Sequence, residues 1–180
     1  MSVHSSYSLG PVVFSHLEIE QAVMQYAQKI NKLYHGKKLV VIGILNGAVF
    51  FVVKFLQHLQ IDIELDFLAV SSYQSQSKKE KIKFYKEIKL DLRDKNILVL
   101  EDIIDSGSTC RLVGEFIQTF APRSLRFCSL ISLQSVQNRS TNYDFLFQTT
   151  PRWLVGFGLD INEQYRHLPD IHELILGKPS

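Results

Sequence analysis

The stretch "NILVLEDIIDSGSTCRLV", residues 96–113, joins two patterns that are seldom adjacent. Its first half is apolar enough for a buried strand, but it runs directly into Glu101 and Asp102. A third acid, Asp105, follows two apolar residues later, and residues 106–109 are then small or hydroxyl-bearing. The stretch therefore predicts a strand, a polar loop and a helix over about 109–120, with carboxylates where the strand ends.

Strand and helix patterns alternate on both sides of this stretch. Strands are predicted at residues 38–45, 61–70, 97–100, 125–133 and 153–159, and helices at 15–35, 47–59 and 109–120. Ser15 and Glu18 have the spacing of a capping box, and Gly36 stops that helix. Loops are predicted at residues 71–81, with an extended flank over 81–88, and at 134–142, and a polar, acidic tail at 160–174. This order predicts an α/β domain with a mostly parallel sheet.

Composition limits what the chain can be. Its 180 residues, 46% hydrophobic and 21% charged, suit a single globular domain spanning 1–180. A net charge of +2 gives no general reason to expect nucleic acid or an anionic membrane as a partner. The apolar runs are too short to span a bilayer, and the first residues lack the pattern of a signal peptide. Cys110 and Cys128 have no metal or disulfide spacing, so we expect core thiols in a cytoplasmic protein.

The acidic strand end has a chemical interpretation. In open α/β sheets, ligands bind beyond the carboxyl ends of the strands, where Glu101 and Asp102 fall. Carboxylates there can accept hydrogen bonds from sugar hydroxyls or hold Mg²⁺, and a hydroxyl-rich loop before a helix can cradle a phosphate. Each feature alone is equally well explained as a solvated strand end or a helix cap. Together, in this order, they indicate a site for a phosphorylated sugar.

At this point the chain resembles a known family. Residues 97–109, "ILVLEDIIDSGST", resemble the phosphoribosyl-pyrophosphate (PRPP) motif of the type I phosphoribosyltransferases, in the form used by the hypoxanthine-guanine branch. Residues 41–51 resemble that family's first substrate loop, 70–73 the start of its flap, and 153–169 its purine-binding segment and hood. The resemblance implies the type I phosphoribosyltransferase fold, a mostly parallel twisted sheet flanked by helices, with a mobile flap at about 71–86 and a C-terminal hood mainly at 160–176.

The resemblance also implies roles around PRPP. Glu101 and Asp102 would bind the ribose hydroxyls, directly or through Mg²⁺, and Asp105 would exchange a proton with N7 of the purine. The 5′-phosphate would be held by Ser106, Gly107, Ser108 and Thr109, with Asp105 beside them in the PRPP site. The pyrophosphate would be bound by Leu45, Asn46 and Gly47, across a non-proline cis peptide, and by Arg166.

Further implied roles concern the base and the flap. Trp153 would stack on the purine, and the backbone of Leu154 and Val155 would read its exocyclic edge. Asp160 would hold a second Mg²⁺ through water, and Ser72 and Tyr73 would begin the flap. The residues alone also allow simpler interpretations: Trp153 as a core aromatic, Asp160 and Arg166 as a structural ion pair, and Leu45–Gly47 as an ordinary turn.

The sequence departs from the family at four places. Leu133 stands where the family usually has a lysine that donates to the 6-oxo group of the purine, and the adjacent Gln134 is the candidate replacement. The flap lacks its usual glycines. Asn46 stands where a basic residue is common, and Ser108 replaces a frequent lysine or arginine. Losing one hydrogen bond to a neutral acceptor typically costs about 0.5–1.5 kcal/mol, which weakens base binding without abolishing it.

The function implied is transfer of the phosphoribosyl group from PRPP to hypoxanthine and guanine in purine salvage, giving IMP and GMP, by a homodimer or homotetramer. One alternative is a preference for xanthine, another 6-oxopurine. A second alternative is a PRPP-sensing regulator that binds nucleic acid without catalysis, which predicts an added domain or basic face and a lost catalytic acid. The nearly balanced charge and the presence of Asp105 favour the enzyme.

Overall fold

The computed structural model describes residues 7–74, 80–133 and 143–177, with residues 71–74 and 80–82 described by their backbone alone. The helices are α1 (His16–Leu33), α2 (Val49–Leu56) and α3 (Ser108–Gln118). The strands are β1 (Tyr7–Phe14), β2 (Leu39–Leu45), β3 (Ile63–Gln74), β4 (Glu80–Lys86), β5 (Asn96–Ile104), β6 (Ser124–Leu133), β7 (Tyr143–Thr149), β8 (Leu154–Val155) and β9 (Ile171–Leu176).

The main sheet has the strand order β4-β3-β2-β5-β6-β7. All of its pairs are parallel except β3 with β4, which confirms the predicted mostly parallel α/β sheet. β2 and β5 pair in register from Leu39 opposite Asn96 to Gly43 opposite Leu100. Because these neighbours run in the same direction, the residues that follow them, Leu45–Gly47 and Glu101–Asp105, emerge at one edge of the sheet.

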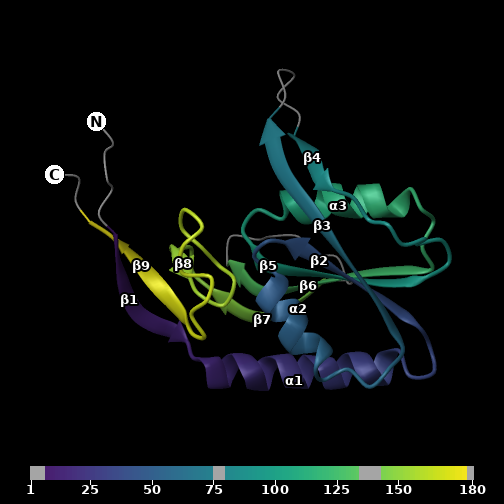
Figure 1. Cartoon of the computed structure of the whole chain (residues 1–180), viewed down its shortest axis with the longest axis horizontal. Helices are drawn as coiled ribbons and strands as arrows, with labels where there is room; N and C mark the ends of the chain where they lie inside the picture. The colour runs from purple at the N-terminus through teal and green to yellow at the C-terminus, as the bar shows by residue number, and fades with distance from the viewer. Residues whose placement is uncertain (1–6, 75–79, 134–142, 178–180) are drawn as a thin grey trace.

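Helices cover both faces of this sheet: α1 and α2 lie on one face and α3 on the other (Figure 1). The central strand β2 is apolar throughout, because its alternate side chains pack into cores on opposite faces of the sheet. In β2, Leu39 and Val41 pack into the core with α1 and α2, whereas Val40 and Ile42 pack into the core under α3. The continuous apolar runs of the sequence are thus explained by burial on two sides.

Helix α1 confirms the predicted cap. The Ser15 side chain accepts from the Glu18 amide, and the Glu18 carboxylate accepts from the Ser15 amide at 2.9 Å. The helix ends at Leu33, and Gly36 takes a left-handed conformation (φ 69°) shortly after it. Both cysteines are buried, as expected. No helix in the described ranges is long and apolar enough to cross a bilayer.

The segment predicted as a loop at 71–81 is different in the structure. β3 continues to Gln74, and β4 begins at Glu80 and pairs with it in antiparallel fashion, so both flanks form a two-stranded arm (Figure 1). The loop was predicted from the polar composition of the segment. Backbone pairing between β3 and β4 outweighs that composition. The residues at the tip of the arm, 75–79, and the predicted loop 134–142 are outside the described residues.

The prediction of a polar tail at residues 160–174 was wrong at its end, because β9 begins at Ile171. β9 pairs in antiparallel fashion with β1 and β8 to form a separate three-stranded sheet beside the carboxyl edge of the main sheet (Figure 1). We call this sheet and the loop of residues 156–170 the hood. β1 and β7 were not predicted, and β8 is only two residues of the strand expected over 153–159. Each of these strands is short or only half-buried, so its apolar pattern is weak.

Candidate active site

The acidic pair lies at the carboxyl end of β5, in the middle of the main sheet. The Oε2 atom of Glu101 is buried and has no hydrogen-bond partner among the described residues. Oδ1 of Asp102 accepts from the Ile103 amide at 2.8 Å. Burial raises the pKa of Glu101 well above its ordinary value, and the neighbouring charge of Asp102 adds to the effect. A buried carboxylate oxygen of this kind can accept a hydrogen bond from a ligand or contact a cation.

The pKa of Asp102 is raised as well. Burial is the main cause, while hydrogen bonds from Glu101 and the Ile103 amide and the charge of Arg166 partly oppose it. Arg166, whose charge is the last of these opposing effects, belongs to the hood loop, 64 positions after Asp102 in the sequence (166 − 102).

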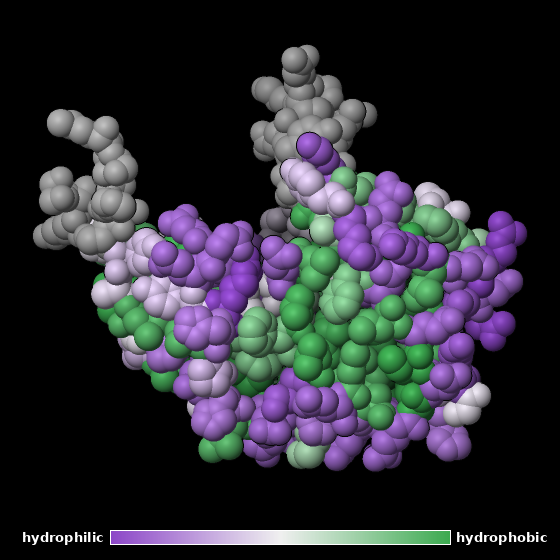
Figure 2. All heavy atoms as spheres, viewed as in Figure 1, coloured by the Kyte–Doolittle hydropathy of each residue, from purple (hydrophilic) through white to green (hydrophobic). Residues whose placement is uncertain are grey.

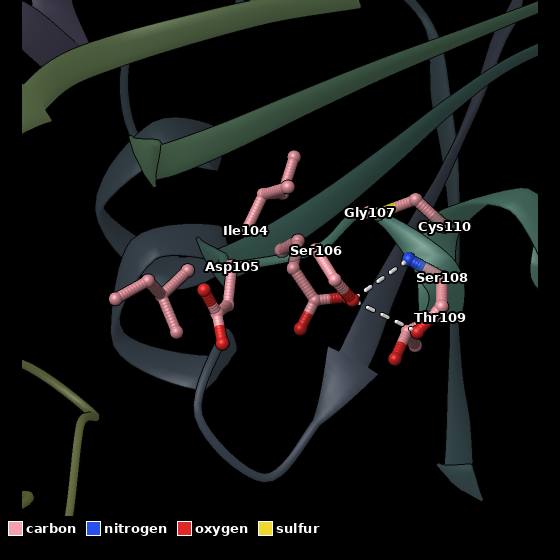
Figure 3. A pocket seen from close by; sticks show the side chains of 9 residues that line it. Ile104, Asp105, Ser106, Gly107, Ser108, Thr109 and Cys110 are labelled. Atoms are coloured by element: carbon pink, nitrogen blue, oxygen red, sulfur yellow. Dashed lines mark hydrogen bonds between the residues drawn. The ribbon is translucent and has the colours of Figure 1, made fainter. Parts of the chain in front are cut away.

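The loop of residues 105–109, which we call the hydroxyl loop, follows β5 directly. It lines part of a hollow of about 240 Å³ (Figure 3). The Ser106 hydroxyl accepts from the Ser108 amide at 3.3 Å and lies 3.0 Å from the Ser108 hydroxyl. Gly107 is left-handed (φ 78°) and is the residue from which α3 begins. Asp105 is exposed at the rim. The lining consists of Glu101, Ile103, Ile104, Asp105, Ser106, Gly107, Ser108, Thr109 and Cys110.

The turn after β2 closes the site from the adjacent strand. The Leu45–Asn46 peptide is cis, as the resemblance implied. Gly47 lies so close to the acidic pair that a Cβ added to it would be 1.6 Å from Oδ2 of Asp102. A Cβ on Gly158 of the hood would in turn be 2.0 Å from the carbonyl oxygen of Gly47. At Gly47 the end of β2 therefore meets the Asp102 side chain of β5 on one side and the backbone of the hood on the other.

Arg166 ties the hood loop together. One of its nitrogens, Nη1, donates to the Gly158 carbonyl at 2.7 Å and lies 2.9 Å from Oδ1 of Asp160. Its other edge meets Glu163, whose Oε2 accepts from Nη2 at 2.8 Å and from Nε at 3.3 Å. Oδ2 of Asp160 accepts from the Glu163 amide at 2.8 Å. The ion pair of Asp160 with Arg166, one of the two interpretations the sequence allowed, is thus present.

The residues predicted to contact the purine, Trp153, Leu154 and Val155, lie in or next to β8 of the hood. Trp153 is 59% exposed just before β8, and its carbonyl accepts from the Leu174 amide at 2.9 Å. Leu154 and Val155 form β8 with buried side chains and pair with β9. Trp153, Leu154 and Val155 do not line the hollow at 101–110.

Leu133 ends β6, 6% exposed, opposite Thr149 of β7. Gln134 lies outside the described residues. Ser72 and Tyr73 belong to the backbone of β3, and their side chains are outside the description.

Two residues at this site escaped the sequence analysis. Gly158 carries the contact with Gly47, and the signal for it was the second glycine of "VGFGLD". Glu163 holds the outer edge of Arg166, and no sequence signal marked it, because an exposed acid in a polar segment has no distinguishing pattern.

The residues fit a magnesium ion only in combination with a substrate. Within the described ranges, no three His, Cys, Asp or Glu side chains are grouped in a way that could hold a metal. Mg²⁺ often takes one or two carboxylates and completes its shell with water and substrate phosphates. Glu101 and Asp102 provide that pair, with one buried oxygen unpartnered. Asp160 already engages both oxygens within its own loop, and its contact with Mg²⁺ stays a prediction.

Comparison with known proteins agrees with this architecture. The family described as "Phosphoribosyl transferase domain" matches residues 13–162. A hypoxanthine phosphoribosyltransferase of Escherichia coli is 33% identical over 169 residues, covering 92% of this chain and 95% of that protein. A hypoxanthine-guanine phosphoribosyltransferase of Mycoplasma genitalium is 36% identical over 160 residues, covering 88% and 91%. A crystal structure of a hypoxanthine-guanine phosphoribosyltransferase from Bacillus anthracis superposes with a TM-score of 0.87 at 29% identity, covering 94% and 99%.

The family model and the relatives, together with the parallel sheet and its acidic strand end, define this chain as an α/β transferase. The chain belongs to the phosphoribosyl transferase family.

Proposed function

We propose that this chain transfers the 5-phosphoribosyl group of PRPP to hypoxanthine and guanine, forming IMP and GMP and releasing pyrophosphate in purine salvage. The observation that carries the proposal is the acidic pair at the end of β5: Oε2 of Glu101 is buried without a hydrogen-bond partner among the described residues, and the Asp102 carboxylate lies against the turn at Gly47, directly before the hydroxyl-bearing residues 106–109. Relatives that carry the names of these activities and match almost the whole chain support it.

Each part of the site has work to do in this reaction. The acidic pair accepts hydrogen bonds from the ribose hydroxyls, and the amides and hydroxyls of residues 106–109 hold the 5′-phosphate at the start of α3. Asp105 takes a proton from the purine ring as another ring nitrogen attacks the anomeric carbon. The turn at Leu45–Gly47 and the guanidinium of Arg166 bind the departing pyrophosphate, on which negative charge builds up.

Mg²⁺ is the proposed cofactor, held by Glu101 and Asp102 and, through water, by Asp160. When bound, it would neutralise charge on the leaving pyrophosphate. The chain's own residues are proposed to orient the sugar and exclude water, the latter by closure of the arm formed by β3 and β4 over the reacting groups.

The base is proposed to bind between Trp153 and the carboxyl ends of β5 and β6. A ring that is 59% exposed offers a stacking surface, which a core aromatic would not. β8 is the edge strand of its sheet, so one side of its backbone is free of strand pairing and can read polar groups of the base. Leu133 cannot donate a hydrogen bond, which leaves Gln134 as the proposed partner of the 6-oxo group.

A second copy of the chain is the proposed macromolecular partner. Figure 2 shows an apolar face over α2 and the adjoining part of β3. Phe50, Val53 and Leu65 are 38–50% exposed there, and Ile63 and Phe67 beside them are only partly buried. Apolar faces of this kind mark protein interfaces. Sedimentation velocity should show a homodimer or homotetramer that Val53→Lys dissociates, while Leu17→Lys, on an exposed position of α1, leaves it intact.

A steady-state assay with PRPP and Mg²⁺ tests the reaction. Guanine, hypoxanthine, xanthine and adenine are each offered as the base, with Asp105→Asn as the control. Turnover of hypoxanthine or guanine, reduced by about 100-fold or more in the control, is the expected result. Turnover of xanthine or adenine instead would keep the chemistry and overturn the base assignment. PRPP binding without turnover of any base would overturn the enzyme and favour a sensor.

A further inference from the structure

The contacts of Arg166 divide into an inner and an outer set. The inner set, the Gly158 carbonyl and Oδ1 of Asp160, fixes the guanidinium against the hood loop. Among the described residues, the outer set is Glu163, which uses one carboxylate oxygen to accept from both Nε and Nη2. The two inner partners already determine where the guanidinium lies. The outer contact is therefore not needed to hold Arg166 in place.

The backbone of Glu163 is fixed by a hydrogen bond, whereas its side chain is mostly exposed to solvent. Its side chain is 75% exposed, whereas that of Arg166 is 21% exposed. Its amide is tied to Asp160, and it follows Asn162 in a pair of left-handed residues with φ of 51° and 62°. Non-glycine residues in this conformation are unfavourable by about 1 kcal/mol or more and cluster at functional sites. The loop thus accepts backbone strain to keep an exposed acid on the outer edge of Arg166.

The outer edge of Arg166 is also the one that suits a phosphate. Nε and Nη2 form the planar fork that binds phosphate oxygens bidentately. An exposed ion pair is weak, worth about 0–1 kcal/mol, and exchanges readily with another anion. Arg166 donates to the Gly158 carbonyl, Gly158 lies against the Gly47 carbonyl, and Gly47 lies against the Asp102 carboxylate. An anion on this fork would therefore lie at the same edge of the sheet as the acidic pair.

We propose that Glu163 is a built-in competitor of the leaving group: it occupies the outer fork of Arg166 in the free protein and is displaced by a pyrophosphate oxygen. Glu163 thereby weakens pyrophosphate binding and favours product release. This inference rests on the proposed function, in which Arg166 binds pyrophosphate, and adds a residue that sets the affinity of that subsite.

Direct binding tests the proposal. Titration calorimetry of the full chain with pyrophosphate and Mg²⁺ is carried out for the wild type, Glu163→Gln and Arg166→Gln. A matched control is Glu173→Gln, which removes the same charge from another hood ion pair, that with Arg152 at 3.5 Å. Glu163→Gln should tighten pyrophosphate binding about two- to fivefold, the range expected for loss of an exposed competing ion pair. Glu173→Gln should leave binding unchanged.

The outcomes separate the two hypotheses. Unchanged affinity in Glu163→Gln would show that the contact does not compete, and weaker affinity would show that Glu163 positions Arg166; either result overturns the inference while the proposed function stands. If Arg166→Gln binds pyrophosphate as tightly as the wild type and has the same thermal midpoint, both the role of Arg166 and the inference fail. The same titrations at increasing salt concentration give a further test. The difference in pyrophosphate affinity between the wild type and Glu163→Gln should decrease as the salt screens the Glu163–Arg166 ion pair.

Discussion

The β5 edge and the hood loop meet at Gly47, but they are built in opposite ways. The β5 edge consists of consecutive residues, 101–110, that pass from a regular strand through one left-handed glycine into a helix. The hood loop has left-handed residues at several non-glycine positions and is held by hydrogen bonds within itself, such as Gly158 to Arg166 and Phe157 to Leu168. The first region is specified by a short window of sequence, whereas the second depends on contacts that form only after folding.

Adding one methyl group at Gly47 should break the junction of the two regions. Its Cβ would overlap the Asp102 carboxylate, and neither that buried side chain nor the Gly158 backbone can withdraw easily. We expect Gly47→Ala to reduce kcat/KM by more than about 100-fold and to destabilise the fold by about 1–3 kcal/mol. Assays with PRPP and hypoxanthine, together with urea unfolding, check both values.

The matched control is Gly107→Ala in the β5 edge itself. Gly107 is left-handed, but a Cβ there would meet only one side-chain atom, of Ile104 at 3.9 Å. The cost should be the conformational strain alone, about 1–2 kcal/mol, with far less effect on kcat/KM. Equal losses of activity in the two variants would contradict the view that the junction, rather than the glycine conformation, is what matters at Gly47.

A substitution at Glu101 tests the β5 edge separately from the hood loop. Because Oε2 is buried without a hydrogen-bond partner in the part of the chain that the structure describes, the metal-free fold carries the cost of an unsatisfied carboxylate oxygen. We expect Glu101→Gln to raise the free energy of unfolding in EDTA by about 2–4 kcal/mol while reducing activity.

Mg²⁺ with PRPP should stabilise the wild type strongly in thermal melts and Glu101→Gln much less, since a ligand stabilises only the state that binds it. A variant that is less stable than the wild type in EDTA would mean that Glu101 has a partner in solution.

Asp66, at the base of the arm, contrasts with Glu101: its pKa is lowered, whereas that of Glu101 is raised. Burial disfavours its charge, but hydrogen bonds from Lys86 and from the amides of Lys89 and Phe67 outweigh this and lower its pKa to about 2. Its contribution to stability is thus present above its ordinary pKa, near 3.9, and is lost as the pH falls through about 2.

At pH 7, Asp66→Asn should cost about 2 kcal/mol, and the difference from wild type should vanish near pH 2. Urea unfolding across this pH range measures it. Asp62→Asn serves as the control, because that carboxylate is 75% exposed and only 4.0 Å from its partner Lys38. A loss that persists unchanged at pH 2 would mean that the charge of Asp66 is not what stabilises the arm.

These contrasts explain what the sequence could predict. The acidic pair, the loop at 106–109 and the mostly parallel sheet were predicted because strand, loop and helix follow one another within one window. The Ser15 cap was predicted for the same reason. β1 and β9 were missed because each needs the other, 150 or more residues away, to become a strand. Glu163 was missed because its only mark is a partner, Arg166, whose position depends on the folded loop.

Leu133 offers the smallest and most specific test, because it lies at the end of β6, outside both regions. Lysine at this position would supply a donor that the family usually has and this chain lacks. Leu133→Lys should lower the KM for hypoxanthine about two- to tenfold, the value of one added hydrogen bond to a neutral acceptor, and leave the KM for PRPP unchanged. Leu133→Met, which keeps the volume and adds no donor, should behave like the wild type.

Leu133 is 6% exposed and packs against the core shared with α1 and α2, so the new ammonium group must reach the carboxyl edge of the sheet to be tolerated. A thermal midpoint close to that of the wild type would show that it does. An unchanged KM for hypoxanthine in a stable Leu133→Lys protein would show that the 6-oxo group is already fully bound by another group. Gln134 would then be the residue to change next, because its side-chain amide can donate and it directly follows Leu133 in the sequence.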